Sequence, residues 1–379
     1  MKNSYDDIFL MEDLEQETQV QEKKAPKKSG GRFFLILLII LLLLSVLVLG
    51  GLLLYSKLKE DEDGERDVPV LSENVEVLYT KEQVDELFAR ELESAVEKEI
   101  ALRGDVLSDI KAYLAGGSSV VESFRRVYKD DIVIVSGGKY HFIPIRDDLK
   151  HNSFVPENLQ ILENGELQYL QDGQVITHKG IDVSKHQGDI DWQKVAADGV
   201  EFAILRVAYR GYGEAGKLNT DEKFEQNIKG ALAAGIRVGV YLYSQAITRE
   251  ELLEEAQLVL DLIAPYKVEC PVVFDVEKVS GDKGRMNEIS VEERTEFTRL
   301  FCETIEKAGY KPMIYHNMEM GALLLNLDEL EQYDKWFAYY NKDFYYPYEY
   351  KMWQYSDKGR INGINGDVDL NISFGPIWE

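Results

Sequence analysis

An unbroken apolar segment from Phe33 to Tyr55 is the feature that most constrains how this chain can fold. The segment contains no charged residue and consists mainly of Leu, Ile and Val. A helix of this length, rising about 1.5 Å per residue, spans a hydrocarbon core of roughly 30 Å with some tilt. A cleaved signal peptide would have a shorter apolar part and a small-residue cleavage site, without so long a polar tail before it. We therefore expect a transmembrane helix at 33–55.

Charged residues on the two sides of this segment predict its orientation. The side before it carries a basic cluster made up of Lys23, Lys24, Lys27, Lys28 and Arg32, whereas the other side begins with the acidic stretch 60–63. By the positive-inside rule, residues 1–32 form a cytoplasmic tail, and the chain after the helix lies outside the cell. The expected localisation is therefore the cell membrane, with a single pass. The acidic tail fits either a cytoplasmic partner or a plain solvated leader.

Composition excludes several classes of protein. With 43 basic and 68 acidic residues, the chain has a net charge of −25, which repels phosphates, so we expect no nucleic-acid partner. A hydrophobic content of 45% is too high for a disordered chain and implies folded domains. Cys270 and Cys302 are too few for a disulfide-stapled miniprotein and lack the spacing of a CxxC site. A disulfide between them and two buried thiols both stay open.

Residues 56–79 are charged and are interpreted as a linker, and residues 80–129 as a helical stalk region. Thr80 is a candidate N-cap with Gln83 completing a capping box, and apolar residues then recur at helical spacing. We expect this helix to end at Gly104, with shorter helices after it. The heptad pattern is short, so we favour packing of this region against its own chain over a coiled coil.

Short strand patterns replace the helical pattern at 130–177. They are separated by Gly137-Gly138, Asn164-Gly165 and Asp172-Gly173, which are typical of tight hairpin turns. We predict a small β module here and assign it no catalytic role. A spacer and a contact module are both compatible with it.

From residue 178 to 379, strand patterns alternate with helix patterns. Helices are expected at 221–234, 249–263 and 290–308. The expected strands are 180–184, 202–208, 237–244, 271–277, 311–316, 335–340, 351–355 and 367–371. Alternation of this kind indicates a parallel α/β sheet, and about eight strands in this length indicate a barrel. Because no long helix separates the last three strands, we expect an irregular (β/α) barrel with few helices.

Four carboxylates fall at the ends of expected strands, where α/β barrels place their active sites. They are Asp182, Asp275, Glu277 and Asp369. Asp275 and Glu277 are two residues apart, so their side chains point to the same face of a strand. Burial and mutual repulsion would raise the pKa of one of them, and a carboxylic acid that stays protonated near neutral pH can donate a proton to a glycosidic oxygen. The histidines show no metal-binding spacing, so we expect neither a metal nor a cofactor.

These residues occur in segments that resemble glycoside hydrolase family 25, the peptidoglycan muramidases of the bacterial cell wall. The segments are Gly180-Ile-Asp-Val-Ser-Lys-His-Gln-Gly-Asp-Ile-Asp-Trp192, Phe274-Asp-Val-Glu277 and Val368-Asp-Leu-Asn371, and weaker matches lie between them in the same order. The resemblance covers about 180–379. It implies a retaining lysozyme that cleaves the β-1,4 bond between N-acetylmuramic acid and N-acetylglucosamine.

The resemblance also implies a role for each carboxylate. Glu277 would be the general acid/base, Asp275 would position the acetamido group of the substrate or stabilise the cation, and Asp182 and Asp369 would bind and orient the sugar. A covalent ester and an oxazolinium formed by the substrate's own acetamide both stay open as intermediates, and we favour the second. A binding or scaffolding protein that holds wall glycan without cutting it is the alternative function.

Aromatic residues of the same region fit a saccharide groove, because their flat apolar faces and polar tips match the faces of a sugar ring. The expected glycan-binding residues are Tyr241, Tyr243, Tyr315, Trp336, Tyr340 and Trp353. For any single one of them, a place in the barrel core is the competing interpretation.

Overall fold

The computed structural model describes residues 81–379 apart from 214 and 280–283. The expected cytoplasmic tail at 1–32, transmembrane helix at 33–55 and linker at 56–79 lie outside the described residues. Within the described part, no helix is both long and apolar enough to cross a membrane. The chain divides near residue 108 into two compact units, and each is described here by itself.

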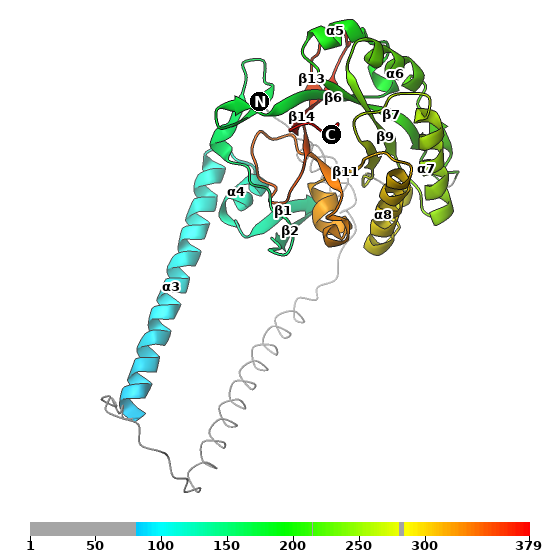
Figure 1. Ribbon diagram of the computed structural model, residues 1–379. Helices are drawn as coiled ribbons and strands as arrows, with labels where there is room; N and C mark the ends of the chain where they lie inside the picture. The colour runs from blue at the N-terminus through cyan, green and yellow to red at the C-terminus, as the bar shows by residue number, and fades with distance from the viewer. Residues whose placement is uncertain (1–80, 214, 280–283) are drawn as a thin grey trace, which may run out of the picture. The chain divides into compact units, whose positions relative to one another are not determined.

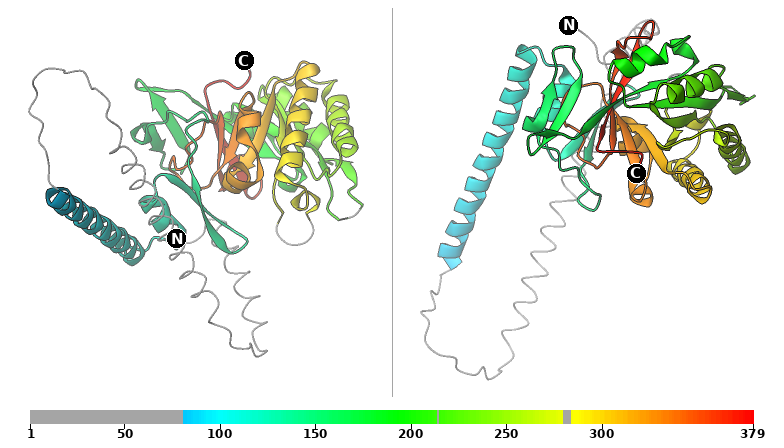
Figure 2. Two further views of the ribbon diagram at one scale, coloured as in Figure 1. Left: turned by 90° about the horizontal axis from the view of Figure 1, so that it is seen from below. Right: turned by 45° about the horizontal axis from the view of Figure 1, so that its top comes forward.

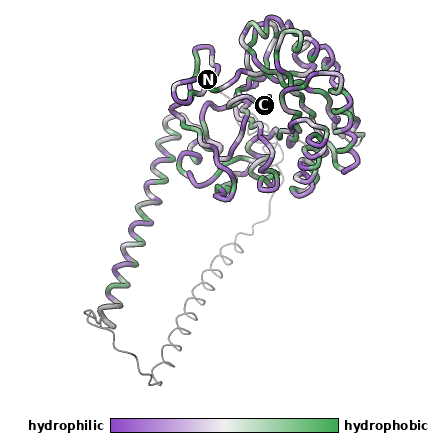
Figure 3. Tube along the Cα trace, viewed as in Figure 1, coloured by the Kyte–Doolittle hydropathy of each residue, from purple (hydrophilic) through white to green (hydrophobic). Residues whose placement is uncertain are grey.

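Helix α3 (Lys81–Ala115) is one continuous helix of 35 residues, so the expected end at Gly104 is wrong. An exposed glycine inside a helix costs only about 1 kcal/mol, which the residues around it outweigh. The helix instead ends at Ala115, and Gly117 just after it adopts a φ of 89°, which lets the Ser118 N–H donate to the Tyr113 carbonyl. Hydrophilic and hydrophobic residues alternate along α3 (Figure 3). Packing of its first part against the rest of the chain stays a prediction.

A short helix and a hairpin open the second unit. Helix α4 (Val120–Val127) begins at Ser119, whose side chain forms a capping box with Glu122. Strands β1 (Asp131–Ser136) and β2 (Lys139–Pro144) then pair antiparallel. Their turn is Gly137-Gly138, with φ values of 55° and 67° that only glycine adopts without strain.

A second small sheet follows this hairpin. It contains three short antiparallel strands, β3 (Leu159–Ile161), β4 (Leu167–Gln171) and β5 (Gln174–Val175). The region predicted as one small β module thus forms two separate sheets. Ile132 and Leu167 from these sheets belong to the same hydrophobic core as the outer wall of the barrel, so both sheets pack on the barrel.

Eight strands close into a barrel, which confirms the predicted irregular barrel (Figures 1 and 2). In barrel order they are β6 (Thr177–Val183), β7 (Phe202–Arg210), β9 (Arg237–Tyr243), β10 (Val272–Asp275), β11 (Pro312–Asn317), β12 (Asp334–Ala338), β13 (Met352–Gly359) and β14 (Val368–Phe374). The pairing of β6 with β7 completes the ring. The pairs are parallel except that β14 runs antiparallel to both of its neighbours. A short strand, β8 (Leu218–Thr220), extends β7 outside the ring.

Helices cover only one part of the barrel wall, as the sequence predicts. They are α5 (Trp192–Ala197), α6 (Phe224–Ala233), α7 (Arg249–Ile263) and α8 (Val291–Lys307). The side chains of Thr248 and Ser290 cap the N-termini of α7 and α8. Outside β12 and β13, aromatic side chains replace the missing helices, as in the stack of Phe337 on Tyr346 with ring centroids 4.1 Å apart.

The interior of the barrel is apolar at one end. Phe202, Ile204, Val273 and Met313 point inward there and form a separate core. Gly180 makes room for this packing, because a Cβ at this position would lie 2.1 Å from the Phe202 ring. The apolar floor leaves the other end, formed by the carboxyl ends of the parallel strands, for polar side chains.

Candidate active site

The four predicted carboxylates meet at the carboxyl end of the barrel. Asp182 lies near the end of β6, Asp275 is the last residue of β10, Glu277 follows two residues later, and Asp369 lies near the start of the antiparallel β14. Each of them alternates with outward-facing apolar neighbours, so all four point into the barrel. They are close enough that the charges of Glu277 and Asp182 both raise the pKa of Asp275.

Asp182 is the most heavily hydrogen-bonded of the four. Its Oδ2 accepts from Asn371 Nδ2 at 2.8 Å and from Gln354 Nε2 at 2.9 Å. Asp369 is its direct partner across β6 and β14, and a further hydrogen bond joins the two carboxyl groups. Burial and the neighbouring charge of Asp182 raise the pKa of Asp369 to about 9. Burial raises the pKa of Asp182 as well, but its hydrogen bonds with Asn371, Gln354 and Asp369 act against that rise, so Asp369 is the member of the pair that keeps a proton near neutral pH.

Asp275 is buried without a hydrogen-bond partner at its Oδ1 atom. Burial first, and then the charges of Glu277 and Asp182, raise the pKa of Asp275 well above its ordinary value, while the Arg206 guanidinium acts in the opposite direction. The backbone carbonyl of Asp275 accepts from Ser244 N at 2.9 Å, which fixes the strand end. An unpaired buried oxygen at the carboxyl end of the barrel is a position where a substrate donor can bind.

Glu277 has the pKa expected of a proton donor. Burial raises the pKa of Glu277 to about 7, and a hydrogen bond with Tyr315 acts against this rise. The negative charge of Asp182 contributes to the rise as well. At neutral pH this side chain is protonated in a large fraction of molecules and can also accept a proton, which suits a general acid/base.

Two amide side chains, which the sequence did not single out, organise the site. Gln354 donates to Asp182, and its Oε1 accepts from the hydroxyls of Tyr315 at 2.9 Å and Tyr340 at 3.0 Å. Asn371 also donates to Asp182, and its Oδ1 accepts from Trp336 Nε1 at 2.8 Å. Asn371 lies two residues after Asp369, so strand alternation already places it on the inner face.

The predicted aromatic residues divide into two groups. Tyr241, Tyr243, Tyr315 and Tyr340 lie next to the carboxylates, since burial and then the charges of one or more of these groups raise the pKa of each tyrosine. Trp336 packs edge-on against both Tyr241 and Tyr315. Trp336 and Tyr315 are buried in the inner core, whereas Tyr241, Tyr243 and Tyr340 are partly exposed.

Trp353 is the exception, and its expected place in the groove is a misassignment. Its neighbour Gln354 points into the barrel, so Trp353 points outward. It is fully buried in the outer hydrophobic core, and its Nε1 donates to the Tyr339 carbonyl at 2.7 Å.

Tyr212, which no sequence pattern indicated, lies beside this group. It is half exposed in the loop after β7, and its hydroxyl lies 3.0 Å from the Tyr243 hydroxyl. The negative charges of Glu277 and Asp275 contribute to the raised pKa of Tyr243, so the pair of hydroxyls lies next to the carboxylates. Tyr212 and Tyr243 are called the tyrosine pair below.

The remaining candidates for metal or redox chemistry lie elsewhere. Among the residues that the structure describes, no group of three or more His, Cys, Asp or Glu side chains is arranged to hold a metal ion. His316 points outward from β11, and burial lowers its pKa to about 4. Cys270 and Cys302 are both buried free thiols, which settles the question of a bridge between them.

The sequence of this region is similar to those of known proteins. Residues 181–364 match the family described as Glycosyl hydrolases family 25. The protein YegX of Escherichia coli K12, described as uncharacterized, is 30% identical over 212 residues, which are 54% of this chain and 72% of YegX. The autolytic lysozyme of Clostridium acetobutylicum is 27% identical over 198 residues, covering 51% of this chain and 55% of the lysozyme.

Solved structures are similar as well. A family 25 glycosyl hydrolase from Bacillus anthracis aligns with a TM-score of 0.44 and 25% identity, over 55% of this chain and 93% of that one. The family match, the identity with YegX and the order of the acidic segments together assign the chain: it belongs to glycosyl hydrolase family 25 and is a glycoside hydrolase.

Proposed function

We propose that this protein is a membrane-anchored muramidase that hydrolyses the β-1,4 bond between N-acetylmuramic acid and N-acetylglucosamine in peptidoglycan. The observation that carries the proposal is Glu277, a carboxyl group with a pKa raised to about 7 beside the unpaired Oδ1 of Asp275. Similarity to a protein named as an autolytic lysozyme supports the choice of substrate.

In the proposed reaction, Glu277 donates its proton to the glycosidic oxygen as the bond to the muramic acid carbon breaks. The sugar that stays behind develops positive charge, which the nearby carboxylates stabilise. Glu277, now ionised, accepts a proton from the attacking water, and the hydroxide adds to the same carbon. The enzyme ends in its starting protonation state, and the product carries a new reducing end.

Asp275 has a different role in this proposal. Its unpaired Oδ1 accepts the N–H of the substrate acetamido group and aligns the carbonyl oxygen of that group behind the reacting carbon. The acetamide then closes an oxazolinium ring as the leaving group departs, and water opens it with net retention. Asp182 and Asp369, held by Gln354 and Asn371, orient the sugar.

The inner aromatic side chains supply the glycan-binding surface of the proposed enzyme. Trp336, Tyr241 and Tyr315 form a rigid edge-to-face group next to the carboxylates. Trp336 and Tyr315 are themselves buried in the inner core, so the partly exposed rings of Tyr241, Tyr243 and Tyr340 are the ones that can stack on the apolar faces of sugar rings.

Membrane anchoring rests on the sequence alone. The apolar segment 33–55, with its basic flank before it, places the barrel outside the cell next to the wall, and residues 80–129 would act as the stalk. In wall-stripped cells, added protease should digest the barrel and spare the tail at 1–32. Protection of the barrel in wall-stripped cells whose membrane is intact would contradict this topology.

The proposed activity is tested with the full-length protein in detergent and purified bacterial cell wall. We expect the turbidity of the wall to fall and new reducing ends to appear. Reduction with borohydride followed by mass spectrometry should find these ends as muramitol. Glucosaminitol instead would indicate cleavage of the other glycosidic bond, and binding without any loss of turbidity would favour the scaffolding alternative.

A further inference from the structure

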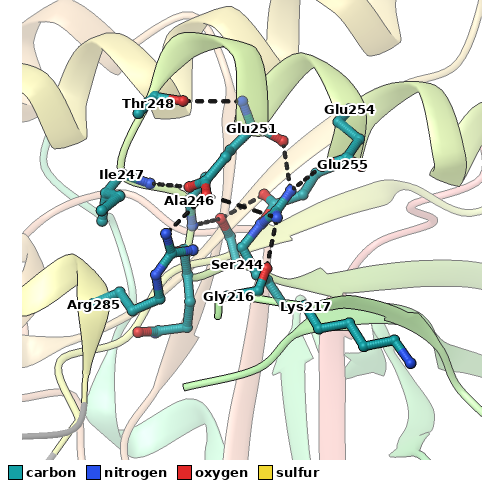
Figure 4. Close-up of polar contacts among 12 residues, drawn as sticks. Gly216, Lys217, Ser244, Ala246, Ile247, Thr248, Glu251, Glu254, Glu255 and Arg285 are labelled. Carbon is teal, nitrogen blue, oxygen red and sulfur yellow. Dashed lines mark hydrogen bonds and ion pairs between the residues drawn. The ribbon is translucent and has the colours of Figure 1, made fainter. Parts of the chain in front are cut away.

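A partly buried polar network, separate from the four carboxylates, joins the loops that follow β7, β9 and β10. Glu251 on α7 is its centre (Figure 4). Its Oε1 accepts from Arg285 Nη2 at 2.8 Å, and its Oε2 accepts from Ile247 N at 2.9 Å. Its backbone carbonyl accepts from Arg210 Nη2 at 2.9 Å. One glutamate thus connects the segments after β9 and β10 to the end of β7.

Arg285 is the member of this network that comes from the loop after β10. Its side chain is almost completely buried, and besides Glu251 it donates from Nη1 to the Gln245 carbonyl at 3.2 Å. It also lies flat against Gly216 in the loop after β7, where an added Cβ would come within 1.9 Å of Nη1. The backbone carbonyl of Gly216 accepts a hydrogen bond from Arg210 Nη1 at 2.7 Å. Arg285 therefore touches both neighbouring loops at once.

Gln245 connects Arg285 to the tyrosine pair beside the carboxylates. Its side chain is fully buried, its Oε1 accepts from Met286 N at 3.3 Å, and its Nε2 donates to the Tyr243 hydroxyl at 3.4 Å. The Tyr243 hydroxyl in turn bonds to Tyr212. The position of the tyrosine pair therefore depends on how Arg285 and Met286 hold Gln245.

The loop that carries Arg285 starts directly after the proposed acid Glu277. Val279 N donates to Asn287 Oδ1 at 3.0 Å, and Asn287 Nδ2 donates back to the Val279 carbonyl at 2.6 Å. This reciprocal pair closes the base of the loop two residues from Glu277. Fixing Arg285 thus fixes the tyrosine pair and the segment after Glu277 relative to each other.

A partly buried ionic network gives little net stability, because desolvation of the charges offsets their attraction. Its effect is on geometry, because the guanidinium of Arg285 bonds Glu251 and the Gln245 carbonyl through separate nitrogens and so restricts how the two partners can lie. We propose that Arg285 is a positioning residue, which acts through Gln245 to hold the tyrosine pair against the glycan and so supports substrate binding. The inference rests on the proposed muramidase function.

The test compares steady-state kinetics of full-length variants on soluble glycan fragments of peptidoglycan. Arg285→Ala should raise KM by about fivefold or more, with kcat within about twofold of wild type and an unchanged pH dependence of kcat, because Glu277 keeps its surroundings. Arg285→Lys keeps the charge but reaches only one partner, so its KM should lie between those of wild type and Arg285→Ala. Arg249→Ala is the matched control. Arg249 lies on α7 close to Glu251, but its side chain forms an exposed pair with Glu296 at 3.1 Å.

Tyr212→Phe keeps the inference falsifiable if Arg285→Ala fails to fold. It removes one half-exposed hydroxyl and should raise KM, as Arg285→Ala does. An unchanged KM in Tyr212→Phe, a fall in kcat alone in Arg285→Ala, or an equal rise of KM in Arg249→Ala would each overturn the role of Arg285. Wild type that does not cut the glycan at all would instead refute the proposed function, so the two failures are distinguishable.

Discussion

Asp182 and Asp369 face each other as direct partners on two antiparallel strands, and their carboxyl groups share a hydrogen bond. Two carboxylates this close do not both ionise in a buried site. The pKa of Asp369 is raised to about 9, so this residue keeps the proton and donates it to Asp182. Asp182 also accepts from two amides, and these three donors together stabilise its negative charge.

This arrangement predicts different effects for two similar substitutions. Asparagine in Asp369→Asn can still donate to Asp182, so we expect kcat/KM on soluble wall fragments to fall by less than about tenfold. In Asp182→Asn the same donors meet a neutral amide in place of a carboxylate, so kcat/KM should fall by about a hundredfold or more. Equal losses in the two variants would mean that the proton does not reside on Asp369.

Glu277→Gln should lower wall hydrolysis by on the order of a hundredfold or more, because the amide has no transferable proton. In the wild type, kcat should fall as the pH rises above about 7, the pKa of the protonated acid. Glycan binding should survive in the variant, since the shape of the side chain is kept. Near-normal turnover by Glu277→Gln would show that another group is the acid.

The raised pKa of Glu277 also predicts a pH-dependent stability difference. The folded group has a pKa of about 7 and the unfolded group one of about 4.5, so the folded state binds more protons between these values. Its contribution to stability is therefore lost as the pH rises from about 4.5 through 7. At pH 8, Glu277→Gln should unfold with a free energy higher than wild type by up to about 3 kcal/mol.

Chemical denaturation at several pH values measures this difference. The gap between Glu277→Gln and wild type should shrink below about pH 4.5, where the folded and unfolded groups are both protonated. Glu306→Gln on the exposed side of α8 serves as the control for a loss of one carboxylate. A gap that does not change with pH would mean that the pKa of Glu277 is the same in both states.

The carboxylates could be predicted from the sequence because their placement follows from simple rules. Strands of period two that end in Asp182 and Asp275 bring both side chains to the same rim whatever the details of packing. Gln354 was missed and Trp353 chosen in its place because the pattern around them does not reveal which face is inward. The register with β12 and β14 decides that, and register depends on the closed barrel.

The network around Arg285 had no signal in the sequence. Arg285 and Glu251 are 34 residues apart and meet only because the loop after β10 folds against the first turn of α7. Tyr212 lies in a loop, where side chains follow no periodicity. The continuous α3 was missed for a different reason, since a single glycine was given more weight than the favourable residues around it.

The opposite orientations of the two tryptophans predict distinct phenotypes. Trp336→Phe removes the donor to Asn371 inside the barrel and should lower kcat/KM by about tenfold or more. Trp353→Phe changes the outer core and should lower the free energy of unfolding by about 1 kcal/mol or more while kcat/KM of the folded enzyme stays close to wild type. A loss of kcat/KM in Trp353→Phe as large as that in Trp336→Phe would mean that Trp353 contacts the glycan.

The unpaired oxygen of Asp275 leads to a prediction about the substrate itself. If Oδ1 accepts the acetamido N–H, then Asp275→Asn should lower cleavage of N-acetylated wall by about a hundredfold or more, because the amide oxygen binds this donor less strongly and the nucleophile loses its alignment. Chemical removal of the acetyl group from muramic acid should make even the wild type inactive, since the substrate then lacks its nucleophile.

A nucleophilic carboxylate predicts the opposite outcome. De-acetylated wall would still be cut, and a fluorinated sugar would leave a glycosyl ester on the peptide of Asp275, Asp182 or Asp369, visible as added mass. Re-acetylation of the same wall sample is the control, because it should restore cleavage only if the acetamide takes part in the reaction. Detection of that ester would refute the assisted mechanism, while the assignment of Glu277 as the acid would stand, since both routes require protonation of the leaving oxygen.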